Sequence, residues 1–176
     1  MNTKRKLNRI LLLRKHAVVI CGEYRVKIDR RKIPLVRRWT WRVITSASGE
    51  RYCVGSNRPN NPTTLSMARL ILGLEFGDRR QADHRNSNGL DNRRKNLRIA
   101  SAQQNAIHRR TPKKPGRSSR FKGVTLNRSA RRWQAQVEFN GRNFYLGLFY
   151  AEEDAARAYN RKAEELFGKW ALLNDL

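Results

Sequence analysis

Cysteine is scarce in this chain. Cys21 and Cys53 are the only two among its 176 residues, and they lie far apart in the sequence. Neither belongs to a CxxC motif or to a Cys/His set with metal-ligand spacing, which argues against a structural zinc site. We therefore expect two reduced thiols in an intracellular setting.

Long apolar runs are also missing. The short apolar stretches ILLL and AVVIC near the N-terminus are separated by Arg14, Lys15 and His16, and no small-residue cleavage site follows them. No run approaches the length that spans a bilayer. A basic amphipathic helix or a basic cluster beside a lipid anchor is not evident. We expect neither a signal sequence nor a membrane partner.

Acidic residues are few. Lys and Arg number 39 against 14 Asp and Glu, which gives a formal net charge of +25. Repulsion among so many positive charges does not stabilise a fold. The excess of positive charge therefore implies a polyanionic partner, with nucleic acid as the first candidate. A disordered basic tail is excluded by an apolar content of 39% and by cations spread along the whole chain. The length fits one large domain or two small ones.

The N-terminal third is rich in β-branched and aromatic residues. The segments YRVKID, WTWRVIT and RYCVGS predict small antiparallel strands, and SASGE between the last two predicts a turn. NRPNNPTT predicts a loop. LSMARLILGL has apolar residues at helical spacing, and Thr64 is a candidate N-cap for that helix. We expect Arg69 on this helix to face a phosphate, an acidic neighbour or solvent.

The segment 82–110 has the pattern of a β-hairpin followed by a helix. A strand is expected to end near His84, and Asn88-Gly89 is a hairpin signal because both residues tolerate positive φ. NLRIAS predicts the return strand. Ser101 and Gln104 match a capping box, so a helix is expected to begin at Ala102.

This hairpin and helix carry the residue types that phosphodiester hydrolysis requires. The imidazole of His84 can accept a proton at neutral pH. Asp83 and an asparagine of the following helix offer oxygen ligands for a magnesium-type ion that keeps several waters. A group of cations in the same segment is expected to face phosphates: Arg93, Arg94, Lys95 and Arg98.

The spacing of these residues resembles the HNH endonucleases of the phage homing type. Asp83-His84 is followed by LDNRRKNLR, with Asn96 twelve residues after His84 and Asn105 nine residues further on. The resemblance implies a ββα-metal core, His84 as general base, Asp83 and Asn105 as ligands of Mg²⁺ or Mn²⁺, and Asn96 as a brace of the intervening loop. The last position is Asn, as in an H-N-N subgroup. His108, one helical turn further on, is the alternative for that position.

A basic segment rich in Pro, Gly and Ser, residues 110–119, is the predicted linker between two domains. The sequence after it alternates: Trp133, Ala135, Val137 and Phe139 share one face of a strand. Asn140-Gly141 predicts a hairpin turn, and Phe144, Leu146 and Leu148 continue the buried face. A helix is expected from Ala151 to Gly168, with the inward residues Ala155, Tyr159, Ala163 and Leu166.

This C-terminal region resembles the APETALA2/ethylene-response-factor DNA-binding domain. The segments GV, YLGLF, AARAYN and the closing LN occur in the order that this family shows. The resemblance implies a three-stranded antiparallel sheet on one helix, with the free face of the sheet in the DNA major groove. Several contact positions differ in type from the plant proteins, and Glu138 reverses a charge, so a different target sequence is implied. The implied DNA contacts are Lys122, Thr125, Asn127, Gln136, Asn143 and Tyr145.

The prediction is an α+β chain with three parts. A β-rich segment and an HNH core occupy residues 1–109, with the motif at 82–109; the linker spans 110–119 and the APETALA2-like domain 120–176. We expect a metal-dependent, sequence-directed endonuclease of the homing type that nicks or cuts double-stranded DNA without an obligate protein partner. Its expected location is the cytoplasm of a bacterial host or phage-infected cell. Two alternatives remain open: a non-catalytic DNA-binding regulator with an inactive HNH fold, and a basic RNA-binding or ribosome-associated protein.

Overall fold

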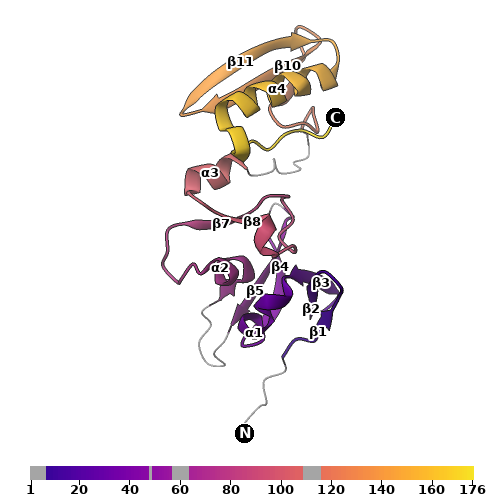
Figure 1. Ribbon diagram of the computed structural model, residues 1–176. Helices are drawn as coiled ribbons and strands as arrows, with labels where there is room; N and C mark the ends of the chain where they lie inside the picture. Colours follow the sequence, from indigo (N-terminus) through magenta and orange to yellow (C-terminus); the bar gives the residue numbers. More distant parts are fainter. Residues whose placement is uncertain (1–6, 48, 57–63, 109–115) are drawn as a thin grey trace. The chain divides into compact units, whose positions relative to one another are not determined.

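The structure is a computed structural model, and it describes residues 7–47, 49–56, 64–108 and 116–176. The chain divides into two compact units, one up to Ala102 and one from Gln103 (Figure 1). The N-terminal unit combines small antiparallel sheets with short helices, and the C-terminal unit combines one antiparallel sheet with a long helix. The predicted α+β class is confirmed at this level.

Three small antiparallel sheets build the N-terminal unit, and the predicted strands are present. Their order in the sheets is β1-β2-β3, β4-β5-β6 and β7-β8. The strands are β1 (Ile10–Leu12), β2 (Ala17–Cys21), β3 (Tyr24–Ile28), β4 (Thr40–Thr45), β5 (Arg51–Ser56), β6 (Leu65–Ser66), β7 (Gln81–His84) and β8 (Leu97–Ala100).

Two short helices complete this unit. The 3-10 turn η1 (Arg30–Lys32) leads into α1 (Ile33–Val36), and α2 (Met67–Leu72) follows β6. The prediction that Thr64 is the N-cap of α2 was wrong. Ser66 is the N-cap, since its Oγ accepts the Arg69 N–H at 3.3 Å and Leu65–Ser66 pair with β5 before the helix begins.

One apolar core joins the elements of the N-terminal unit. Val19, Val26 and Ile28 of the first sheet pack with Val36 of α1 and Met67 of α2, and each of these five side chains is fully buried. Trp41 joins them, and its indole N–H donates to the Val36 carbonyl oxygen at 2.9 Å. Both cysteines are free and buried. Burial of these apolar side chains is the main term that stabilises so small a unit.

The side chain of Arg69 was expected to face phosphate, an acidic neighbour or solvent. Asp78 is such a neighbour: Arg80, and to a smaller extent Arg69, lower the pKa of its carboxyl. The guanidinium of Arg69 also has a role that was not expected. It donates to the carbonyl oxygens of Glu75 and Arg80 at 2.7 Å and of Asp78 at 3.0 Å. These bonds hold the loop between α2 and β7, so Arg69 organises the backbone just ahead of β7.

The hairpin of β7 and β8 is present, but its turn is not the tight one expected at Asn88-Gly89. A loop of residues 85–96 joins the strands, and neither Asn88 nor Gly89 has positive φ; Ser87 does, at 54°. Gly89 is required by close packing instead, because a Cβ there would lie 2.2 Å from the Arg51 carbonyl oxygen of β5. Contact with β5 therefore overrides the local turn preference.

The C-terminal unit has a three-stranded sheet of order β11-β10-β9 packed on one long helix, as expected. The predicted turn is confirmed, since Asn140 and Gly141 have φ of 51° and 73°. The predicted helix start at Ala102 is confirmed too, although that helix belongs to this unit from Gln103 onward. The elements are α3 (Ala102–Ile107), β9 (Val124–Asn127), β10 (Arg132–Phe139), β11 (Arg142–Phe149), α4 (Glu152–Phe167) and η3 (Gly168–Trp170).

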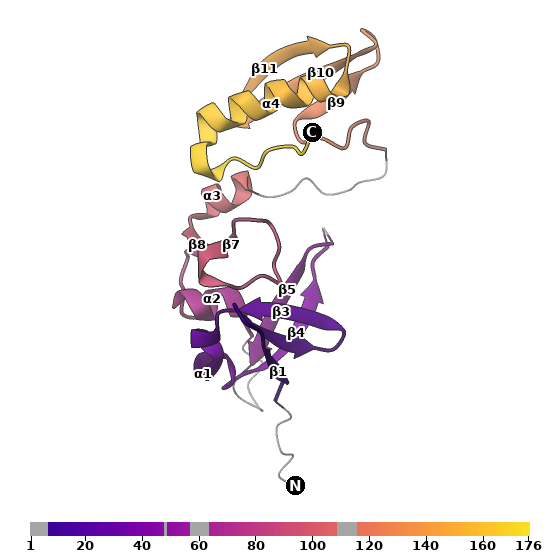
Figure 2. The ribbon, with the colours of Figure 1, turned by 45° about the vertical axis from the view of Figure 1, so that its right-hand side comes forward.

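Small residues allow α4 to lie close to the sheet (Figure 2). Ala155 and Ala163 are fully buried, and Tyr159 is 3% exposed, as the helical spacing predicts. Gly123 lies under the Tyr159 ring with φ of +72°, and a Cβ at this position would meet that ring at 2.1 Å. Gly123 is therefore required by both conformation and space.

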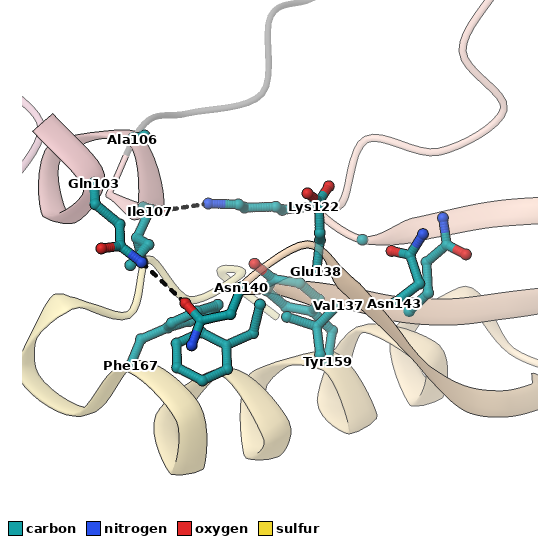
Figure 3. A pocket seen from close by; sticks show the side chains of 13 residues that line it. Gln103, Ala106, Ile107, Lys122, Val137, Glu138, Asn140, Asn143, Tyr159 and Phe167 are labelled. Atoms are coloured by element: carbon teal, nitrogen blue, oxygen red, sulfur yellow. Dashed lines mark hydrogen bonds between the residues drawn. The ribbon is translucent and has the colours of Figure 1, made fainter.

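Hydrogen bonds of Lys122 and Gln103 attach α3 to the rest of the C-terminal unit (Figure 3). Lys122 Nζ donates to the Ile107 carbonyl oxygen at 2.6 Å, and Gln103 Nε2 donates to Asn140 Oδ1 at 3.0 Å. A pocket of about 440 Å³ lies between α3, the sheet and α4. Burial lowers the pKa of Lys122 to about 8, so this amine is part of the packing of the unit.

The division between the units falls at Gln103, before the predicted linker at 110–119. Residues 110–115 of that linker lie outside the described residues, as do residues 57–63 of the predicted loop ahead of α2. The linker boundary therefore stays a prediction. Within the described ranges, no helix is both long and apolar enough to cross a bilayer.

Gly123→Ala is expected to lower the free energy of unfolding by about 3 kcal/mol, because the new methyl group clashes with the Tyr159 ring. Gly141→Ala is the control. Its φ of +73° is the same within a degree and nothing lies within 4 Å of the added Cβ, so about 1 kcal/mol of conformational strain is expected. Urea unfolding of both variants measures the difference, and equal losses would contradict the packing described.

Lys122 is expected to make stability rise with pH. Its pKa is about 8 in the folded chain and 10.5 when unperturbed, so the unfolded state binds more protons between these values and unfolding becomes less favourable as pH increases. Urea unfolding of the wild type and Lys122→Met at pH 7.5, 8.5 and 9.5 provides the test. The free energy of unfolding of the wild type should increase relative to that of Lys122→Met as the pH rises. A difference in free energy that stays constant with pH would show that Lys122 is not buried.

Candidate active site

The pair Asp83-His84 lies at the end of β7, and Asp83 is buried against β8. Asp83 is opposite Arg98 in the register of the hairpin, and Arg98 Nε donates to Asp83 Oδ2 at 2.5 Å. The two side chains are 6% and 8% exposed. A cation therefore already contacts the carboxylate that the sequence predicts as a metal ligand.

The imidazole of His84 is held by Asn92, a residue that the sequence reasoning missed. His84 Nε2 lies 3.2 Å from Asn92 Oδ1, while the Asn92 amide N–H donates to the Gly89 carbonyl oxygen. Since Oδ1 can only accept, this arrangement assigns the imidazole proton to Nε2 and leaves the lone pair on Nδ1. The only signal for this contact in the sequence is one more asparagine in an asparagine-rich loop.

Burial also tunes His84. The side chain is 8% exposed, and desolvation lowers the pKa of His84 below its usual 6.5, against the opposing effects of the Asn92 contact and of Asp83 and Asp91. At neutral pH the imidazole is therefore the neutral form, which can accept a proton.

Asn96 ties the two ends of the loop together. Its Nδ2 donates to the Asp91 carbonyl oxygen at 2.8 Å and to Asn86 Oδ1 at 2.9 Å, and its Oδ1 accepts the Asn86 N–H at 3.1 Å. Asn96 is 7% exposed, so these bonds are largely shielded from water. This geometry is what a loop brace requires, while a role for Asn96 in catalysis stays a prediction.

Backbone pairing with β3 holds the same loop from outside the hairpin. Lys27 N–H donates to the Leu90 carbonyl oxygen, and Asn92 N–H donates to the Lys27 carbonyl oxygen, each at 2.8 Å. Asp29 Oδ2 accepts the Arg94 N–H at 2.6 Å. Figure 2 shows the loop running alongside β3 before it returns to β8. Asp29 carried no signal in the sequence because its partner is far along the chain.

The four cations expected to face phosphates lie in different surroundings. Arg94 and Lys95 are exposed, as DNA contact requires. Arg93 is half-buried and pairs with Asp91 at 2.6 Å. The structure corrects the placement of Arg98, which is buried against Asp83 because it pairs across the hairpin. A contact between Arg98 and phosphate therefore requires its ion pair to open.

The second predicted ligand lies in the other unit. Asn105 is on α3 and half-buried, and His108, the alternative, is 7% exposed just after the same helix. Asp83 and Asn105 are thus described in separate units, and their role as joint ligands stays a prediction. No cluster of three or more His, Cys, Asp or Glu side chains suited to a metal occurs among the described residues. Carboxylate and amide oxygens still suit Mg²⁺, which keeps most of its waters.

The exposed face of the C-terminal sheet carries the predicted DNA contacts. Gln136 lies opposite Tyr145, Glu138 opposite Asn143, and Thr125 on the same face one strand over. The alternating residues Ala135 and Val137 pack against α4 instead. Thr125, Glu138, Asn143 and Tyr145 are exposed, whereas Asn127 and Gln136 are half-buried. Lys122, the remaining predicted DNA contact, differs from these residues, because its amine donates to the Ile107 carbonyl oxygen.

Plant transcription factors are similar to part of this chain. The chain is 38% identical over 76 residues to APETALA2-like protein 2 of Oryza sativa subsp. indica, which covers 43% of this chain and 18% of that protein. It is 39% identical over 66 residues to the AP2-like ethylene-responsive transcription factor TOE2 of Arabidopsis thaliana, 38% of this chain and 13% of that protein. The shared part is thus a small fraction of each plant protein.

A viral protein is similar over most of the chain. No family model and no solved structure matches. An uncharacterised HNH endonuclease of Acanthamoeba polyphaga mimivirus is 32% identical over 145 residues, which are 82% of this chain and 72% of that protein. With this identity over so large a share of both proteins, the chain belongs to the HNH endonuclease family.

Proposed function

We propose that this chain is a metal-dependent, sequence-directed DNA endonuclease of the homing type. The observation that carries the proposal is the arrangement around β7: a buried Asp83 beside a neutral His84 whose ring is held by Asn92. Membership of the HNH endonuclease family and similarity to APETALA2-like proteins support a nuclease that binds DNA.

His84 is the proposed general base. With the proton on Nε2 directed to Asn92, Nδ1 accepts a proton from a water molecule, and the resulting hydroxide attacks phosphorus in line with the leaving 3′ oxygen. The P–O3′ bond breaks, the leaving O3′ takes up a proton from solvent water, and the products are a 5′-phosphate and a 3′-hydroxyl. The loop braced by Asn96 keeps Asn92, and therefore the ring, in place while this happens.

Asp83 and Asn105 are the residues that would hold Mg²⁺ or Mn²⁺. Both offer hard oxygen atoms, and Asp83 already holds a cationic group, the guanidinium of Arg98. A divalent cation bound there would offset the negative charge that develops on the phosphate during cleavage.

The C-terminal sheet is the proposed reading surface. Its exposed polar face can enter a major groove and contact base edges, while α4 covers the opposite face. Tethering this module to the nuclease raises the effective concentration of the nuclease at the target site. A non-catalytic regulator is the second candidate, and the tests below separate it from the nuclease.

His84→Ala is expected to reduce the nicking rate of supercoiled DNA in Mg²⁺ by about 10²- to 10⁴-fold, because the general base is lost. DNA binding should be unchanged. His16→Ala is the matched control, since His16 lies in the turn between β1 and β2. Its backbone carbonyl oxygen accepts the Leu13 N–H, and among the described residues its side chain forms no hydrogen bond or ion pair. A rate in His84→Ala equal to that of the control would contradict the assignment of the base.

Asn96→Ala is expected to cost about 1–3 kcal/mol of stability, because buried polar groups of the loop lose their partners. Faster amide hydrogen exchange in residues 85–96 and lower nicking should accompany this loss. Asn88→Ala serves as the control, as Asn88 is exposed in the same loop and its side chain accepts one hydrogen bond, from the Leu90 N–H. Unchanged exchange in Asn96→Ala would show that the loop is held by β3 alone.

A further inference from the structure

A strongly cationic turn joins β3 to β4 in the N-terminal unit. Five basic residues occur within the nine positions after Asp29: Arg30, Arg31, Lys32, Arg37 and Arg38. No acidic residue lies among these nine. Like charges at this density repel one another, so the turn gains from a polyanion that binds there.

The turn is firmly anchored, unlike a basic tail. Val36 is fully buried, Ile33 packs against the same core, and the Val36 carbonyl oxygen accepts the indole N–H of Trp41. The Arg37 N–H donates to the Ile33 carbonyl oxygen at 2.9 Å, which closes the helical turn of α1. The apolar residues therefore face the core, and the backbone that presents the cations is already ordered before a ligand binds.

The cations of this turn are available to a ligand. Arg30, Arg31 and Arg37 are exposed, and Lys32 is half-buried. Within the part of the chain that the structure describes, none of these four takes part in an ion pair. They differ in this respect from Arg93 and Arg98, which are paired with acidic residues beside the candidate active site.

Asp29 links the turn to the candidate active site. Its carboxylate accepts the Arg94 N–H, and Lys27, two residues earlier, pairs with both Leu90 and Asn92. Arg94 and Lys95, both exposed, are thereby fixed next to the start of the cationic turn. Hydrogen bonds of Asp29 and Lys27 therefore connect the cationic turn with the loop of residues 85–96.

We propose that Arg30, Arg31, Lys32 and Arg37, the α1 surface, bind the phosphate backbone of duplex DNA. The nuclease unit would then hold a duplex of any sequence by itself, beside the bond that is cut, while the C-terminal sheet supplies sequence preference. The place of this surface beside the cut rests on the proposed function, whereas DNA binding by it does not. Guanidinium groups on an exposed turn suit phosphate contacts, which carry no sequence information.

The test compares two full-length double variants that each remove two exposed charges from the N-terminal unit. Arg30→Gln/Arg31→Gln changes the α1 surface, and Arg14→Gln/Lys15→Gln changes the turn between β1 and β2. Dissociation constants for a random-sequence DNA duplex are measured in EDTA over a range of salt concentrations. The α1 variant should bind about tenfold more weakly at low salt, with a salt slope smaller by about 1.8, the value for two phosphate contacts.

The control variant should keep a slope close to the wild type, and equal effects in the two variants would overturn the proposal. A loss of binding to duplex RNA with none to duplex DNA would overturn it as well. If the double variant does not fold, Arg37→Gln takes its place, with an expected slope change of about 0.9. EDTA prevents cleavage, so the binding measurement does not depend on nuclease activity. If these binding changes are observed but the chain does not cut DNA in Mg²⁺, the proposed function is contradicted, whereas DNA binding by the α1 surface is still supported.

Discussion

The candidate active site depends on how one long loop is held. Residues 85–96 separate the two strands that carry Asp83, His84 and Arg98. The side chain of Asn96, at one end of this loop, bonds Asn86 near the other end and Asp91 in the middle. The β3 backbone and Asp29 bond its outer side. Through these contacts Asn92 reaches His84, and Arg94 and Lys95 stay exposed. Without the N-terminal sheet, the loop would lose the pairing that orders it.

Buried and exposed charged residues near the candidate site have different roles. The ion pair of Asp83 and Arg98 is buried, and such pairs add little net stability because both groups are desolvated. Its value is in the position it gives to Asp83, one residue before His84. The exposed cations of the α1 surface and of residues 94–95 lie instead where a polyanion can reach them. The large net charge is thus concentrated in part around the candidate site.

Sequence patterns correctly predicted the features that depend on residues close together in the chain. Alternation and Asn140-Gly141 gave the β10–β11 hairpin, because both positive-φ residues lie in the turn itself. Helical spacing gave the buried residues of α4. At Asn88-Gly89 the same dipeptide behaves differently, since Gly89 is packed on β5. Asn92, Asp29 and the burial of Lys122 and Arg98 could not be predicted, because each depends on partners that only the tertiary structure brings near. The spacing of His84, Asn96 and Asn105 indicated the family, whereas the contacts of these side chains could be described only from the structure.

We propose that this chain hydrolyses DNA with a metal ion at the site around His84. The most direct measurement is incubation of the wild-type protein with supercoiled plasmid in Mg²⁺ or in EDTA, followed by treatment of the products with DNA ligase. We expect nicked or linear DNA only in Mg²⁺, with ends that ligase reseals because they are 5′-phosphate and 3′-hydroxyl. Intact plasmid in Mg²⁺ and in Mn²⁺, at protein concentrations that saturate DNA binding, would contradict it.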